Sequence, residues 1–301
     1  MPTNTPRVSI VIPAYNEAFF AEAFASARAQ TYADLEIVVC DDSPGNFIDA
    51  TVRASNDPRV RYQRNPQQLG FNGNFTECLR QARGELIKFL NDDDRLAPQC
   101  VEALAAALDY DPRVTLATSR RTPIDERGVP VKGHPASAPL SHVSCLIPGE
   151  ELVNFVLINS TNVIGEPSTV MFRKRDIEMD AGGLFSWNGR AYHCLADLSL
   201  WTRLLAKGDA FYQAVALSDY RNHSGQQQAD PSMEVKCMAE RFYLAREARA
   251  LGFLKHAAHY RAALSHPLKK AEQALQTRVL PESARAALRS LSAEIRAALV
   301  D

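Results

Sequence analysis

The sequence predicts an open α/β sheet of mostly parallel strands flanked by helices, followed by a helical extension. Two patterns support this prediction. Through about the first 120 of the 301 residues, short apolar runs rich in Val and Ile alternate with stretches whose apolar residues recur at helical spacing. From Ser232 onward, Ala, Leu, Arg and Glu dominate the composition. Apolar runs without polar alternation suit strands buried on both faces, and helices between them suit the crossovers of a parallel sheet.

The first half of the chain supplies five expected strands and four expected helices. The strands lie at residues 8–12, 35–40, 60–63, 85–90 and 114–119. The first helix is indicated by the helical spacing of Phe19, Phe20, Ala23, Phe24 and Ala27, and the other three cover 46–55, 73–83 and 98–109. Ligands of such sheets bind beyond the carboxyl ends of the strands, where PAYNE, DDSPG and NDDD are found.

The second half has a mixed pattern. A hairpin is expected around Gly128 within residues 122–131, and a Pro- and Ser-rich connector follows at 132–150. The remaining elements are a helix at 150–159, a strand at 168–172, a loop at 180–194, a helix at 196–207 that Gly208 ends, and a strand at 210–217. Two or three helices should close the chain, with Pro267 and Pro281 as breaks.

Bulk composition excludes several classes of partner. The formal net charge is −1, so no general electrostatic attraction to nucleic acid is expected. No apolar run approaches the roughly 20 residues that cross a bilayer, so we expect no transmembrane segment, while peripheral contact with a membrane stays open. Six cysteines are scattered without a C-x-x-C pair, which favours reduced thiols and a cytosolic setting.

Three consecutive carboxylates, Asp92, Asp93 and Asp94, follow the expected strand at 85–90. Like charges repel one another unless solvent or a cation relieves them. They could cap the helix that begins near Pro98, or one or two of them could hold Mg²⁺ or Mn²⁺. Asp42 ends a neighbouring strand, and we expect it to be exposed at the same edge of the sheet.

Four segments together resemble the successive motifs of family 2 glycosyltransferases: VSIVIPAYNE, LEIVVCDDSP, GELIKFLNDDDRLAP and LADLSLWTRLLAKG. The resemblance runs from about residue 6 to residue 225. It implies the GT-A fold, a Rossmann-like and mostly parallel sheet, in a catalytic domain at residues 1–230. Residues 6–120 would form the nucleotide-binding half and 121–230 the acceptor half, with a C-terminal helical region at 231–301.

The resemblance assigns the donor side to the first three motifs. Nucleotide contacts fall on Pro13, Ala14, Tyr15, Glu17, Asp42 and Asp92. Tyr15 would stack on the base, and a carboxylate at Asp42 would accept a hydrogen bond from a pyrimidine such as that of UDP or dTDP. Asp93 would be the main ligand of Mn²⁺ or Mg²⁺, and His223 would lie near the diphosphate and the metal. Asn91 replaces the first Asp of the usual signature, and Asp94 could instead fix the turn.

The fourth motif implies the chemistry on the acceptor side. Asp197 would be the general base, although Ala196 stands where relatives carry Glu. Further acceptor contacts are expected from Glu166, Ser168, Trp187 and His193. The expected activity is metal-dependent, inverting transfer of a sugar from a nucleoside-diphosphate sugar to a hydroxyl of a carbohydrate or lipid-linked glycan. The setting would be bacterial polysaccharide or glycan assembly in the cytoplasm, and a place at the inner face of the membrane stays open.

Two other classes stay open. A nucleotidyltransferase that makes sugar nucleotides also uses carboxylate-bound Mg²⁺, but the sequence has neither a P-loop nor a glycine-rich phosphate loop after its first strand. A catalytically inactive relative that only binds carbohydrate or protein is the second class, and the departures at Asn91 and Ala196 keep it open.

Overall fold

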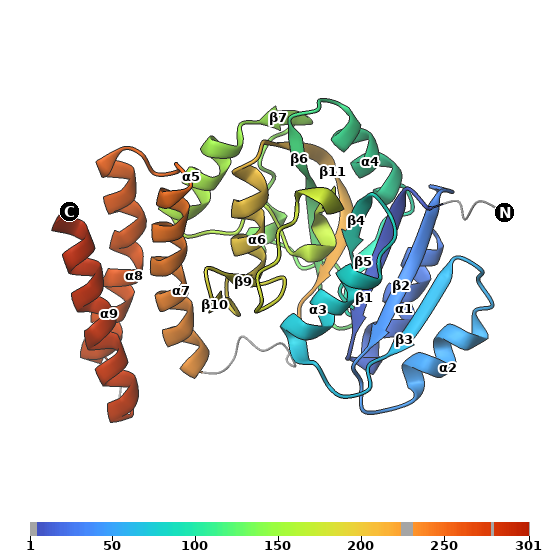
Figure 1. The fold of residues 1–301 in the computed structure, drawn as a ribbon, viewed down its shortest axis with the longest axis horizontal. Coiled ribbons are helices and arrows are strands. Elements are labelled where there is room, and N and C mark those ends of the chain that lie inside the picture. The colour runs from blue at the N-terminus through green and yellow to red at the C-terminus, as the bar shows by residue number, and fades with distance from the viewer. Residues whose placement is uncertain (1–4, 224–230, 278–279, 301) are drawn as a thin grey trace.

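The computed structural model describes residues 5–223, 231–277 and 280–300. One large sheet carries the strands in the order β3-β2-β1-β4-β8-β6-β11-β5, and β7 adds to β11 (Figure 1). The strands are β1 Val8–Ala14, β2 Leu35–Asp41, β3 Val60–Arg64, β4 Leu86–Phe89, β5 Arg95–Leu96, β6 Val114–Ile124, β7 Cys145–Ile147, β8 Met171–Arg173 and β11 Asp209–Arg221. A separate short hairpin joins β9 Ser186–Trp187 to β10 Arg190–Ala191.

Helices cover both faces of this sheet, as the sequence predicts. They are α1 Glu17–Arg28, α2 Phe47–Ala54, α3 Gly70–Gln81, α4 Cys100–Asp109, α5 Gly149–Asn159, α6 Ala196–Leu205, α7 Pro231–Ala250, α8 Ala257–Thr277 and α9 Glu282–Val300. One apolar core lies between the sheet and α1, α2 and α4. The other lies between the opposite face and α3, α5 and α6, and it continues into α7, α8 and α9.

The first half of the sheet is parallel. β1 pairs with β2 from Val8↔Leu35 to Ala14↔Asp41 and with β4 on its other side. All seven residues of β1 are buried, which explains why the run lacks polar alternation. Because the strands run the same way, the ends of β1, β2 and β4 meet at one edge and bring their following loops together.

The second half of the sheet is mixed, and here one expected element is wrong in part. Residues 167–169 form a 3₁₀ turn instead of the start of a strand, so that β8 is short and antiparallel to β4 and β6. Pro167 lacks the N–H that a ladder needs, and the Ser168 carbonyl accepts a bond from the Lys88 ammonium group. The expected hairpin is confirmed: Gly128 has φ +80° and Ile124 bridges to Pro130.

The three C-terminal helices pack on one another beside α5 and α6 (Figure 1). Pro281 does precede the start of α9, but the expected break at Pro267 is wrong, since α8 continues through it. A proline inside a helix costs about 3 kcal/mol. Pro267 is itself buried, together with Leu264 and Ala271, so tertiary packing offsets this cost. In the described part of the chain, no helix is long and apolar enough to span a membrane.

The expectation of six reduced cysteines is also wrong for one pair. Cys194, in the loop before α6, forms a disulfide with Cys237 of α7, with the two Cα atoms 5.2 Å apart. The remaining four, Cys40, Cys78, Cys100 and Cys145, are free thiols. The two bonded residues are 43 positions apart, so only the packing of α7 reveals that they meet.

Candidate active site

Asp92 joins the ends of β1 and β4. Its Oδ2 accepts hydrogen bonds from the backbone N–H groups of Tyr15 and Asn16, both at 2.6 Å. Burial, together with the neighbouring charge of Asp93, raises the pKa of Asp92 to about 7. Tyr15 and Asn16 of the first motif and Asp92, the first residue of the aspartate triplet, are thus parts of one turn cluster.

Asp94 points into the protein. Its carboxylate accepts bonds from Ser168 Oγ at 2.6 Å, from Asn91 Nδ2 at 3.1 Å and from the backbone N–H of Arg221 at 2.9 Å. Burial and the charge of Asp93 raise the pKa of Asp94 well above its usual range. Asp94 therefore connects the turn after β4 to the turn before β8 and to the end of β11. This placement fits the expectation that Asp94 fixes the turn.

Asp93 and His223 are brought together from opposite ends of the sequence. His223 Nε2 lies 3.1 Å from Asp93 Oδ2, because the buried Arg221 anchors the end of β11 by donating from Nε to the Asp93 carbonyl at 2.7 Å. Two neighbouring ligand atoms of an octahedral ion with bonds of about 2.1 Å are about 3 Å apart, so this pair fits two adjacent positions. An imidazole in the set favours Mn²⁺ over Mg²⁺.

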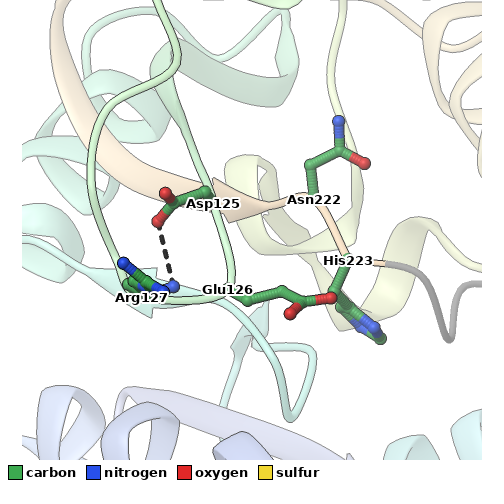
Figure 2. Close-up of a pocket in the computed structure, with 5 residues that line it drawn as sticks. All are labelled: Asp125, Glu126, Arg127, Asn222 and His223. Atoms are coloured by element: carbon green, nitrogen blue, oxygen red, sulfur yellow. Dashed lines mark hydrogen bonds between the residues drawn. The ribbon is translucent and has the colours of Figure 1, made fainter.

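A hollow of about 470 Å³ opens beside His223. The turn after β6 and the end of β11 line it, with Asp125, Glu126, Arg127, Asn222 and His223, and Figure 2 shows Glu126 extending toward His223. Across the described residues, no group of three or more His, Cys, Asp or Glu side chains is arranged to hold a metal. A metal at Asp93 and His223 would therefore need further oxygen ligands from the substrate or from water.

Asp42 is not exposed as expected, since only 6% of it is accessible. Its Oδ1 accepts bonds from Asn65 Nδ2 at 2.9 Å and from the Leu69 N–H at 2.8 Å, and its Oδ2 accepts one from the Gly70 N–H at 2.8 Å. The segment that leads into α3 folds over the carboxylate and covers it. A carboxylate has about four acceptor positions, so one remains for a base.

The other donor-side residues differ in access. Pro13 and Ala14 are buried at the end of β1, whereas Tyr15 is 52% exposed and its ring is open to a ligand. Glu17 begins α1, and its Oε1 accepts a bond from the Phe47 N–H at 3.3 Å. Buried Asn74, which the sequence analysis did not single out, donates to the carbonyls of Ala14 and Cys40 and so ties α3 to β1 and β2.

Asp197 lies in the first turn of α6, and Asn162 holds its carboxylate. Asn162 Nδ2 donates to Asp197 Oδ2 at 2.6 Å, and the Leu198 N–H donates to Oδ1 at 2.7 Å. Burial raises the pKa of Asp197 to about 7. The charge of Glu166 adds to this rise, and the charge of Arg121 opposes it. A carboxyl group with that pKa can take up and release a proton near neutral pH.

The loop from residue 162 to 166 is fixed by several contacts that the sequence did not reveal. Asn162 Oδ1 accepts from the Gly165 N–H at 2.9 Å, and Trp201 Nε1 of α6 donates to the Gly165 carbonyl at 3.0 Å. Glu166 is paired with Arg121, with 2.7 Å between the carboxylate and Nε. The polar run NSTNVIGEPS is a signal that could have pointed to Asn162, but the partners of this loop come from distant strands and helices.

The remaining acceptor candidates are placed as follows. Ser168 is 2% exposed and its hydroxyl is bonded to Asp94, so its expected contact with an acceptor has no geometric support. Trp187 belongs to the apolar core, and the side chain of His193 is exposed. Glu166 is the one of the four whose charge acts on Asp197.

Helix α7 clamps the loop that precedes Asp197. The Glu240 carboxylate accepts bonds from the N–H groups of His193, Cys194 and Leu195 at 2.8–2.9 Å. The Cys194–Cys237 disulfide joins the same loop to the preceding turn of α7. The C-terminal helices thus form part of the wall around Asp197.

Comparison with known proteins places the chain in a family. The model of the family described as "Glycosyl transferase family 2" matches residues 9–177. An uncharacterized protein of Mycobacterium tuberculosis is 32% identical over 221 residues, which are 72% of this chain and 67% of that protein. A Campylobacter jejuni GalNAc(5)-diNAcBac-PP-undecaprenol beta-1,3-glucosyltransferase is 35% identical over 103 residues, and the match spans only 33% of each protein.

Solved structures agree with this fold. The S. aureus TarS 1–349 structure with UDP has a TM-score of 0.64 at 17% identity, covering 97% of this chain and 83% of that one. The mannosyltransferase PcManGT from Pyrobaculum calidifontis, with GDP-Man and Mn²⁺, has a TM-score of 0.56 at 17% identity, covering 99% and 84%. With a family match over more than half of the chain and a sheet of the GT-A type, this protein belongs to glycosyl transferase family 2.

Proposed function

We propose that the protein transfers a sugar from a nucleoside-diphosphate sugar to an acceptor hydroxyl, with inversion at the anomeric carbon. The observation that carries this proposal is Asp197, a half-buried residue whose carboxylate has a pKa raised to about 7 and is held by Asn162. A base on one face and a leaving-group site on the other are what a single in-line displacement needs.

Asp197 is the general base of this proposal. Its Oδ2 receives the hydroxyl proton while the acceptor oxygen attacks, and Asn162 keeps that oxygen oriented. Glu166, which is paired with Arg121, contributes to the raised pKa and lies where it can contact the acceptor sugar. A positioned base of this kind contributes about 10²- to 10⁴-fold to the rate.

The donor side uses the ends of β1, β2 and β4. Tyr15 stacks on the base, and the free acceptor position of Asp42 receives a base N–H, for which UDP or dTDP is the favoured partner. Asp93 and His223 would hold Mn²⁺ or Mg²⁺, an ion that would offset negative charge on a leaving diphosphate. The Mn²⁺ in PcManGT and the UDP in TarS support this arrangement for relatives of the same fold.

The acceptor is proposed to be a glycan in bacterial polysaccharide assembly. Two relatives are named for acceptors linked to undecaprenol through a diphosphate, one from Campylobacter jejuni and one from Escherichia coli. On this proposal residues 1–230 form the catalytic domain, 231–301 form a helical region on its acceptor side, and the enzyme works at the inner face of the membrane. None of the described helices is long and apolar enough to span a membrane.

A screen of nucleotide diphosphates, with and without Mn²⁺, tests the proposal by thermal denaturation, because a ligand that binds only the folded state stabilises it. We expect UDP or dTDP to raise the melting temperature only when Mn²⁺ is present, and the matching sugar nucleotide to be hydrolysed slowly without acceptor. Sugar-1-phosphate and nucleoside triphosphate should yield no sugar nucleotide. Absence of any nucleotide effect would reject the enzyme in favour of a binding module.

A further inference from the structure

The start of α6, which carries Asp197, is held by a neighbouring helix. Leu195 is the N-cap of α6, and its apolar side chain cannot accept a hydrogen bond there. The Leu195 N–H donates to the Glu240 carboxylate of α7 at 2.8 Å, and the Leu195 carbonyl accepts from the Ser199 N–H at 2.8 Å. The position of α7 therefore fixes where the first turn of α6 begins, and with it the carboxylate of Asp197.

Two neighbouring positions of α7 hold the loop at 193–195. Cys237 is bonded to Cys194 of this loop, and Glu240 follows Cys237 by three residues, on the same face of the helix. The Cys194 N–H donates to Glu240 at 2.9 Å, so the disulfide and the carboxylate hold the same residue. Because the disulfide keeps the loop beside Glu240, it raises the effective concentration of one group for the other. The hydrogen bonds to Glu240 should therefore open more often once the disulfide is reduced.

Other contacts keep α7 in place without the disulfide. The Tyr192 hydroxyl donates to Glu247 of α7 at 2.7 Å. The Arg190 guanidinium lies 3.4 Å from the centre of the Tyr243 ring, and the buried Phe242 adds α7 to the apolar core. Reduction should therefore loosen the loop at 193–195 while α7 stays packed, so one folded protein has a clamped and a loosened form of this loop.

The disulfide lies where a reductant can reach it. Cys194 and Cys237 are both half-buried. Three of the four free thiols, by contrast, are fully buried, namely Cys40, Cys78 and Cys100. Thiols of a reducing compartment open accessible disulfides, and the disulfides found in such compartments are usually transient and regulatory. The position of this bond therefore suits a reversible link better than a permanent one.

We propose that the Cys194–Cys237 disulfide is a reversible redox switch that sets the rate of sugar transfer through the start of α6. A thiol reductant such as glutathione opens the switch: its thiolate attacks one sulfur, the S–S bond breaks, and a second reductant thiol displaces the mixed disulfide. Two cysteine thiols and one oxidised reductant result, so two electrons and two protons pass to the protein. The reverse exchange closes the bond. The switch rests on the proposed function in taking Asp197 as the base and the cytoplasm as the setting.

Equilibration of the full chain with mixtures of reduced and oxidised glutathione, up to the reducing strength of a cytoplasm, tests the switch. Samples are desalted under argon before Mn²⁺ and donor are added, and alkylation with mass spectrometry gives the bonded fraction of Cys194 and Cys237. The variant is Cys194→Ser, which cannot form the bond, and the matched control is Cys145→Ser, which removes a free, half-buried thiol. Hydrogen exchange of the amides at 193–195 is followed in the same samples, because it reports on the loop without any substrate.

Reduction should lower kcat by about tenfold, because the base loses its fixed orientation, and should speed hydrogen exchange at 193–195. The Mn²⁺-dependent UDP shift should persist, which shows that the reduced protein is folded. Cys145→Ser should respond as the unmodified protein does, and Cys194→Ser should keep the reduced rate in every mixture. The proposal is overturned if the bond does not open and close across the mixtures, or if Cys194→Ser still responds to glutathione. Constant exchange, a constant rate of an active enzyme, or loss of the UDP shift together with the rate would overturn it as well. If neither redox form transfers sugar, the proposed function alone is rejected, and the exchange at 193–195 decides whether the disulfide switches the loop.

Discussion

The two sides of the proposed site are built in different ways. In the donor edge, by which we mean Asp42, Asp92, Asp93 and His223, the carboxylates of Asp42 and Asp92 accept hydrogen bonds mainly from backbone N–H groups. The acceptor wall, meaning Asn162, Glu166, Asp197 and the loop at 193–195, rests on side-chain contacts with β6, α6 and α7 and on a disulfide. Asp92 is held by the loop that follows the neighbouring strand β1, whereas the loop at 193–195 depends on Cys237 and Glu240, which lie more than 40 positions away in the sequence.

This difference implies that damage to the C-terminal helices should affect the acceptor wall and leave the donor edge intact. The donor edge belongs to a rigid sheet whose strands are buried on both faces. The acceptor wall is closed by α7, which joins the catalytic region through Glu240 and Cys237. Substitutions on each side can therefore separate donor binding from sugar transfer.

The largest effect is expected from Asp197→Asn. Without a group that accepts the hydroxyl proton, kcat should fall by about 10²- to 10⁴-fold, the usual contribution of a positioned base. The Asn side chain can still hydrogen-bond to the Leu198 N–H, so the fold should be kept. Rates are measured with saturating donor, and donor affinity by the Mn²⁺-dependent thermal shift. Transfer close to the unmodified rate, with normal donor binding, would show that the proton goes elsewhere.

The next largest effect, on stability and on transfer, is expected from removal of the disulfide. Opening a link across 43 residues should lower the free energy of unfolding by about 2–4 kcal/mol, because the unfolded chain gains freedom. Denaturant unfolding of Cys237→Ser measures this, and Cys145→Ser, which removes a free thiol, is the control. The acceptor wall should loosen, so transfer should fall more than UDP binding does. Equal losses of both would contradict the independence of the two sides.

A third effect is expected at the donor edge. Asp93→Ala removes one of the two proposed metal ligands, and we expect at least tenfold weaker Mn²⁺-dependent nucleotide binding, or about 1.4 kcal/mol. The Asp93 backbone carbonyl still accepts from Arg221, so the end of β11 should stay in place. Titration of Mn²⁺ at fixed UDP gives the affinity, with Asp125→Ala in the neighbouring hollow as the control. If Asp125 matters and Asp93 does not, the metal is bound in the hollow.

How much the sequence could predict follows the same division. The strands and helices of the first half are found within a few residues of their expected positions, because buried parallel strands give continuous apolar runs. The pairing of Asp93 with His223 was expected only through the family resemblance, since 130 positions separate the two residues. The burial of Asp42 was missed because the covering segment lies between β3 and α3 and carries no apolar pattern.

The acceptor wall was the harder part to predict. Asn162, Arg121 and Glu240 are ordinary polar residues in the sequence, and each gains its role from a partner 35 to 47 positions away. The predictions of six reduced cysteines and of a helix break at Pro267 were wrong for the same reason, because tertiary packing of α7 and α8 overrides the local signal. The spacing of apolar residues along the sequence predicts secondary structure, but it does not predict which helix packs against which loop.

The smallest expected effect concerns the pH dependence of transfer. A base with a pKa of about 7 is protonated below that value, so kcat should fall about tenfold per pH unit below pH 7 and level off above it. Asn162 donates to the charged form of Asp197, and its removal in Asn162→Ala should move the midpoint to higher pH by up to about one unit. Asn159→Ala, on the exposed end of α5, should leave the midpoint unchanged.

UDP binding, measured over the same pH range, should not follow this midpoint. If it does, the titrating group belongs to the donor edge, where Asp92 has a similarly raised pKa, and the profile of Asn162→Ala would then coincide with that of the unmodified protein.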